Sequence, residues 1–371
     1  MVLDLIDFTP AQVSPWIILA AGILVFIESA MAKWPVIKKF YLFSITISLS
    51  NLCGSFLIII FLGKFFFQDV PYEKFAWLAA IFVPTDNKLY SGLFHHPYMP
   101  DRIKQLLHIE ALSNQTLAIC LGFIFFYFFF KKNLLFTLGI SVLLVAAAGV
   151  PFAFLIYAFW KKEYIPEKFL GYIWIIFACV LFIFSQYLAE SGFLTMLLFG
   201  IFLGHKFRFL CRPLMLFAAR EGNYLYYLII FLFSISYLSY QMMHLHTNAL
   251  YLGLLLPLLI RAAAFLGAVL RNSGYQKPTF GFISWFGPKG MLSLALAAQF
   301  IWDASEPWAL MVWTVFFSIW IYGITTLPAA SLYMRFLRRQ RAEDLEEEIP
   351  AVNLPLGLHA RDEDISPFHN R

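Results

Sequence analysis

The chain has 371 residues, of which 61% are hydrophobic and 13% are charged, and it contains 43 phenylalanines. A soluble globular chain is nearer half apolar and a quarter charged, so this composition excludes that class and predicts an all-α polytopic membrane protein in a lipid bilayer. The formal net charge of +5 is therefore interpreted as a signal of membrane topology. We expect no nucleic-acid partner.

A spanning helix needs about 20 apolar residues. About 11 segments qualify or come close, and they are 14–33, 40–66, 74–94, 105–130, 134–160, 169–188, 191–205, 223–243, 248–270, 279–301 and 307–334. An odd number of spans places the two ends of the chain on opposite sides of the membrane.

Basic residues gather after the odd-numbered spans, for example at Lys38, Lys161 and Arg271. The positive-inside rule then predicts an external N-terminus and a cytoplasmic C-terminus, in a bacterial inner membrane. The pair Lys131 and Lys132 contradicts this pattern. Residues 1–13 are read as an N-terminal segment, and the acidic stretch within residues 337–371 predicts a disordered cytoplasmic tail.

Two spans carry helix-breaking residues next to charged ones. The third contains IFVPTDNKLYSG, where Pro84 disfavours a helix at Val83 and Asp86 follows, and the tenth contains ISWFGPKGMLSLALAAQF. In the second motif, Lys289 stands among Gly287, Pro288 and Gly290. Each span is predicted to consist of two half-helices around an extended centre. The alternative is a pair of simple proline kinks, although a kink needs no ionisable residue.

Paired broken spans are typical of transporters built from inverted repeats. Spans 2–4 and 9–11 would be the two repeats, with their broken helices crossing in the middle of the membrane. In this arrangement Asp86 would offset the positive N-termini of half-helices, and Lys289 would offset the negative C-termini.

The fourth span begins with a polar face. Glu110 and Asn114 are four residues apart and Gln115 lies beside them. A buried glutamate needs a counter-ion, and Arg261 is isolated in the apolar ninth span, so we expect a Glu110–Arg261 ion pair. In the alternative, Arg261 extends to the membrane surface. Glu28, in the first span, is read either as a buried acid or as a residue of the cytoplasmic interface.

At this point the sequence resembles the sodium/proton exchangers of the monovalent cation:proton antiporter group, over roughly residues 15–340. FVPTDN resembles the family's PTDP motif at Pro84, Thr85 and Asp86, and IEALSNQT resembles its xESLLNDx motif at Glu110, Leu112 and Asn114. Four further stretches resemble family motifs in the same order, namely SQYLAESGFLTMLLFGIFLG, LIRAAAF with Arg261, FGPKGMLSLALA with Lys289 in place of arginine, and YGITTLP.

The resemblance implies a core transport domain at 39–133 and 247–336, and dimerisation helices at 14–38 and 134–246. It also implies a homodimer that exchanges Na⁺ or K⁺ for H⁺ without a further cofactor. Thr85, Asp86, Asn114, Gln115 and Glu28 would form the ion site, and Glu110 with Arg261 would form a structural pair.

Two departures from the family affect the expected function. Gln115 stands where the family has its exchanging aspartate, and an amide has no titratable proton. The chain also starts at the position of the family's third helix. Three functions therefore stay open: an antiporter that uses Glu28 or Asp86, an uncoupled cation pathway, and a relative without transport. An enzyme is not expected, because Walker and G-x-G-x-x-G motifs are absent from the sequence.

Overall fold

The computed structural model describes residues 9–32, 34–86, 88, 99–129, 133–270, 277–300 and 306–339. Within these ranges the chain is helical and has no strand, which confirms the predicted all-α class. The helices are α1 (Pro10–Ala30), α2 (Trp34–Phe66), α3 (Tyr72–Ile81), α5 (Asp101–Phe129), α6 (Leu134–Leu144), η3 (Val145–Gly149), α7 (Val150–Lys161), α8 (Glu167–Ala189), α9 (Gly192–Lys206), η4 (Arg208–Cys211), α10 (Arg212–Phe233), η5 (Ser234–Leu238), α11 (Ser239–Met243), α12 (Thr247–Leu270), α13 (Lys277–Trp285), α14 (Met291–Phe300) and α15 (Glu306–Arg339).

Among the described residues, 7 helical segments are long and apolar enough to cross a membrane, or up to 8 if a bent pair at α9 counts as one span. The 7 match the first, second, fourth, fifth, sixth, eighth and eleventh predicted spans. The other predicted spans are short, broken or partly outside the described residues, so the total of eleven stays a prediction. Two spans contain a π turn, η3 and η5, which hydrophobic periodicity does not predict.

The two predicted helix breaks are present and lie against each other. Helix α3 ends at Ile81 and residues 82–86 are not helical, while residues 286–290 separate α13 from α14. The Asp86 backbone nitrogen donates a hydrogen bond to the Pro288 carbonyl oxygen at 2.9 Å, so the two non-helical segments are joined directly. The second half of the third span, residue 87 and residues 89–98, lies outside the described residues, as does the tail from residue 340.

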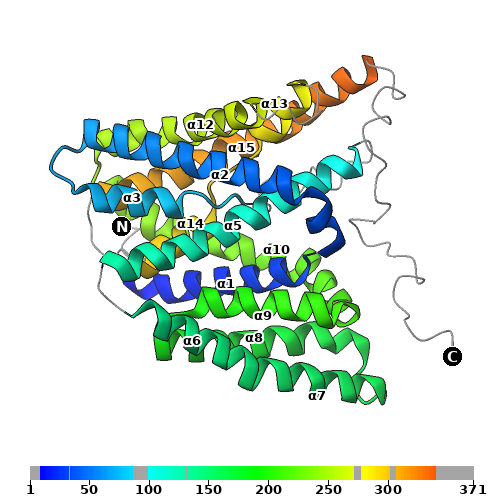
Figure 1. The fold of residues 1–371 in the computed structure, drawn as a ribbon. Coiled ribbons are helices and arrows are strands. Elements are labelled where there is room, and N and C mark those ends of the chain that lie inside the picture. The colour runs from blue at the N-terminus through cyan, green and yellow to red at the C-terminus, as the bar shows by residue number, and fades with distance from the viewer. Residues whose placement is uncertain are drawn as a thin grey trace, which may run out of the picture.

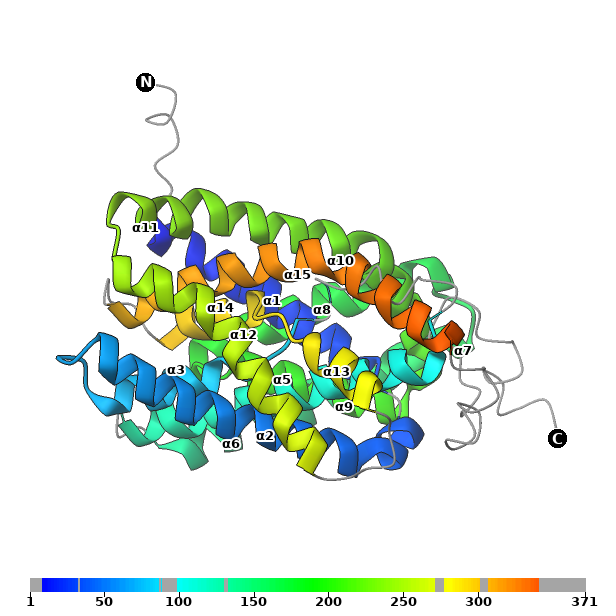
Figure 2. The same ribbon diagram turned by 90° about the horizontal axis from the view of Figure 1, so that it is seen from above.

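The helices are arranged around these breaks. In Figure 1, α1, α6, α7, α8 and α9 lie in the lower half, α2, α3, α12, α13 and α15 lie in the upper half, and α5, α10 and α14 lie between them. Figure 2 shows α10 and α11 along the upper edge of the view, with α15 below them. Helix α12 packs against both α2 and α15. The inverted symmetry of the two repeats stays a prediction.

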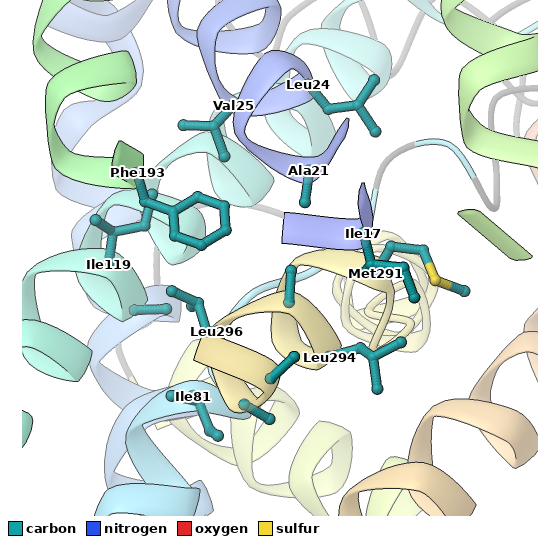
Figure 3. Packing of buried hydrophobic residues seen from close by; sticks show 14 of the residues in the cluster. Ile17, Ala21, Leu24, Val25, Ile81, Ile119, Phe193, Met291, Leu294 and Leu296 are labelled. Atoms are coloured by element: carbon teal, nitrogen blue, oxygen red, sulfur yellow. The ribbon is translucent and has the colours of Figure 1, made fainter. Parts of the chain in front are cut away.

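Helix α1 packs closely against α9 because small residues of α9 face it. A Cβ atom at Gly200 or Gly204 of α9 would collide with the α1 backbone at Phe26 and Ala30. On another face, α1 packs its apolar side chains against α14, and Figure 3 shows Ile17 beside Met291 in this cluster. This packing holds Glu28, near the end of α1, next to the helix breaks.

We expect Gly290→Ala to destabilise the fold by about 2 kcal/mol, because its Cβ would overlap the Asp86 carboxylate. Gly323→Ala in α15 is the matched control, since no atom lies within 4 Å of its added Cβ. The midpoint of thermal unfolding of the purified protein in detergent measures both effects. Equal midpoints for the two variants would contradict the close approach of Gly290 and Asp86.

Candidate functional site

The Asp86 carboxylate joins the two helix breaks. Its Oδ2 accepts hydrogen bonds from the Met291 backbone nitrogen at 3.1 Å and from Tyr226 Oη at 2.9 Å, and its Oδ1 accepts one from the Lys88 backbone nitrogen at 3.0 Å. Met291 is the first residue of α14, so Asp86 caps the positive end of that half-helix. This contact confirms the prediction that Asp86 lies beside the N-terminus of a half-helix.

Helix α10 contributes three contacts to the same place. Besides Tyr226, which is buried, it provides the Ala218 carbonyl oxygen and Asn223 Oδ1, which accept hydrogen bonds from Lys88 Nζ at 3.1 and 3.2 Å. The sequence did not single out Tyr226 or Asn223, because the eighth span contains no charged residue or helix break after Gly222. Lys88, by contrast, stood out as a charge within an apolar span.

Glu28 lies beside the helix breaks rather than at the membrane surface. Its carboxyl group interacts with the Gln115 side chain and with the charges of Asp86 and Lys88. Residues from four elements therefore meet here, because Glu28 belongs to α1, Asp86 follows α3, Gln115 belongs to α5 and Tyr226 belongs to α10. Glu28 and Asp86, the two carboxylates predicted for the ion site, therefore lie close together.

Several buried oxygen atoms around the breaks have no hydrogen-bond partner. They include Thr85 Oγ1, Asn114 Oδ1 and Gln115 Oε1. A buried polar atom without a partner costs free energy unless water or an ion satisfies it. Carboxylate, amide and hydroxyl oxygens are ligands for hard cations. The donor set thus fits a hard cation.

Arg261 of α12 and Glu110 of α5 are in contact at a buried position. Arg261 Nη1 lies 2.8 Å from Glu110 Oε1, and both side chains are almost fully buried. The remaining guanidinium nitrogens donate to the backbone: Nε to the Ser284 oxygen at 2.7 Å, and Nη2 to the Ile283 and Phe286 oxygens at 3.1 and 2.5 Å. The guanidinium therefore caps the C-terminus of α13 while it pairs with α5.

That the Lys289 charge offsets a helix C-terminus stays a prediction. Lys289 Nζ is buried and makes no hydrogen bond within the described residues, and the carbonyls at the end of α13 bind Arg261. A planar guanidinium reaches several carbonyls at once, and a single ammonium does not. Gly287 is needed for this approach, since a Cβ there would overlap Arg261. The Lys289 backbone nitrogen instead donates to Ser318 Oγ at 2.6 Å.

No protein-family model matches the chain, and neither does any curated protein. A search of solved structures finds the sodium proton antiporter MjNhaP1 from Methanocaldococcus jannaschii, in a structure at pH 8. The match has a TM-score of 0.59 and covers 90% of this chain and 86% of that chain, at 16% sequence identity. The chain has the fold of this antiporter. At this identity the likeness concerns the fold alone.

We expect Arg261→Met to destabilise the protein by about 3–5 kcal/mol, because it leaves Glu110 buried without its counter-ion. The double variant Arg261→Met with Glu110→Leu should recover only part of this loss, since the α13 carbonyls stay unpaired. Lys289→Met is the control and should leave stability unchanged or raise it, because Nζ has no partner to lose. Thermal unfolding measures all three. Full recovery in the double variant would show that the carbonyl contacts contribute nothing.

Proposed function

We propose that the protein exchanges a monovalent cation, Na⁺ or K⁺, for protons across the membrane. The observation that carries the proposal is the meeting of Glu28 and Asp86 with unpaired buried oxygens at two joined helix breaks. Non-helical backbone at membrane depth is tolerated where it lines a polar cavity or is buried in protein. The antiporter fold supports the same conclusion.

Glu28 is the carboxyl group best suited to bind the cation and the proton in turn. Asp86 is held by three donors and serves to join the half-helices. Glu28 has the Gln115 side chain as its neighbour and, within the described residues, no backbone donor. Gln115 supplies an amide oxygen to a cation but no proton, so proton exchange falls to Glu28.

A second candidate function is a cation pathway without proton coupling, or a protein that no longer transports. Lys88 favours this candidate, because its ammonium lies near both Glu28 and Asp86 and offsets part of their negative charge. With Gln115 in place of a third carboxylate, the site attracts cations less strongly than a site of acids alone.

Alternating access would require the outer side of the site to be closed when the inner side is open. Two contacts close the end of the molecule at the α8–α9 turn: Tyr127 Oη donates to the Ala189 oxygen at 3.0 Å, and Gln299 Nε2 donates to the Glu190 oxygen at 2.5 Å. Under the proposed orientation this end faces outward. Under the proposed division, residues 39–133 and 247–336 move as the transport domain against 14–38 and 134–246, so both contacts join the moving part to the scaffold.

Transport is tested in liposomes that hold a pH-sensitive dye. A pulse of Na⁺ or K⁺ should alkalinise the interior, and Glu28→Gln should lower this signal to that of empty liposomes because no proton is left to exchange. Glu167→Gln at the start of α8 is the matched control and should retain the rate. Cation uptake without a pH change would favour the uncoupled pathway. A silent wild type that gains activity in Gln115→Asp would favour an inactive relative, and full activity of Glu28→Gln would disprove the assignment of Glu28.

The contact between Gln299 and Glu190 at the α8–α9 turn is tested by a reversible cross-link. In a variant with its four native cysteines replaced by alanine, Glu190→Cys and Gln299→Cys should form a disulfide under oxidation and stop transport, because the transport domain is then fixed to the scaffold. A reductant should restore the rate, and either single cysteine should have no effect. Continued transport by fully cross-linked protein would show that these two parts do not move apart.

A further inference from the structure

A hollow lies away from the helix breaks, between the end of α9, the segment after α1, the first half of α2 and the middle of α5. Its volume is about 530 Å³. We call it the lateral groove. Its walls are formed mainly by Ile45 and Leu49 of α2, Ile109 and Leu112 of α5, and Ile201 and Phe202 of α9.

The polar groups in the lateral groove offer little to an ion or to water. Thr116 Oγ1 donates to the Leu112 carbonyl oxygen of its own helix at 2.8 Å, and Ser113 Oγ bonds Ser44 Oγ at 2.6 Å. Ser48 is the exception, since its buried hydroxyl has no partner. The walls are otherwise aliphatic and aromatic, so a hydrocarbon chain suits the groove better than a hydrated solute.

The groove is separate from the ion site. Along α5, Ile109, Ser113 and Thr116 face the groove, whereas Glu110 and Asn114 project from the other side of the helix. Glu110 meets Arg261 there. None of the proposed cation ligands lines the groove, so a molecule bound in the groove would not contact the ion site.

The mouth of the groove is basic. His205 lines it at the end of α9, and the next residue, Lys206, is exposed. On the opposite wall, Ile37 lines the groove and the adjacent Lys38 is also exposed. These residues lie where helices end and connections begin, which is the depth of lipid headgroups. Basic groups at this depth attract anionic lipids.

We propose that the lateral groove binds one acyl chain of an anionic phospholipid, with the phosphate beside Lys38, His205 and Lys206. The apolar walls take the chain and the basic mouth selects the headgroup. Since α9 forms one wall and α2 and α5 the other, a bound lipid contacts helices on both sides of the groove. The inference does not depend on transport activity.

The test uses vesicles that contain phosphatidylglycerol with a photoreactive diazirine in its acyl chain. Label should appear on peptides that contain residues 109–117 and 201–205. Ile201→Trp fills the groove and should remove this label, and Leu112→Phe narrows it from the other wall if the first variant does not fold. The matched control is Ile183→Trp, at a side chain of α8 that is 55% exposed and outside the groove, and it should leave the label in place.

The headgroup is tested with the same label on phosphatidylcholine. Lys38→Gln combined with Lys206→Gln should lower labelling by phosphatidylglycerol by at least about fivefold and leave labelling by phosphatidylcholine unchanged. Equal labelling by the two lipids in the unmodified protein would overturn the anionic assignment. Equal loss of label in Ile201→Trp and Ile183→Trp, or no label in the groove peptides, would overturn the binding site itself.

Discussion

The structure depends on satisfying the backbone groups that two broken helices expose inside a membrane. Each unpaired peptide group in hydrocarbon costs several kcal/mol, and a half-helix that ends at mid-depth has no water to bind its last groups. Asp86 binds the first nitrogen of α14, and Arg261 binds three carbonyls at the end of α13. One acid and one base thus make both ends of the second break tolerable.

These two side chains have their own charges to offset, and this links the break to the rest of the molecule. Arg261 is paired with Glu110 of α5, and Asp86 is bound by Tyr226 of α10. The glycines of the segment between α13 and α14 give these side chains room, since a Cβ at Gly287 would overlap Arg261 and a Cβ at Gly290 would overlap Asp86. Lys289 makes no hydrogen bond in this network within the described residues, and its buried ammonium interacts electrostatically with Glu110 and Arg261.

The sequence was most informative where helix-breaking residues and charges occur in apolar surroundings. Pro84 and the Gly287–Gly290 motif marked both breaks, and the solitary Arg261 indicated a partner such as Glu110 because a lone buried charge is costly. Tyr226 and Asn223 could not be found in this way, since such residues are ordinary in a membrane helix and their role comes only from the packing of α10. The sequence could not show that Arg261 binds the carbonyls at the end of α13, because spacing does not reveal which of two buried cations, Arg261 or Lys289, reaches them.

The attachment of α10 to the first break has a mechanical consequence. Tyr226 and Asn223 are three residues apart, so they lie on the same side of α10 and contact Asp86 and Lys88 together. A slide of α10 along the break would lengthen both hydrogen bonds at once. One helical turn toward the N-terminus, about 5.4 Å away, the corresponding positions are Ala219 and Gly222, which have no polar side chain, so the contacts hold α10 in a single register against the break.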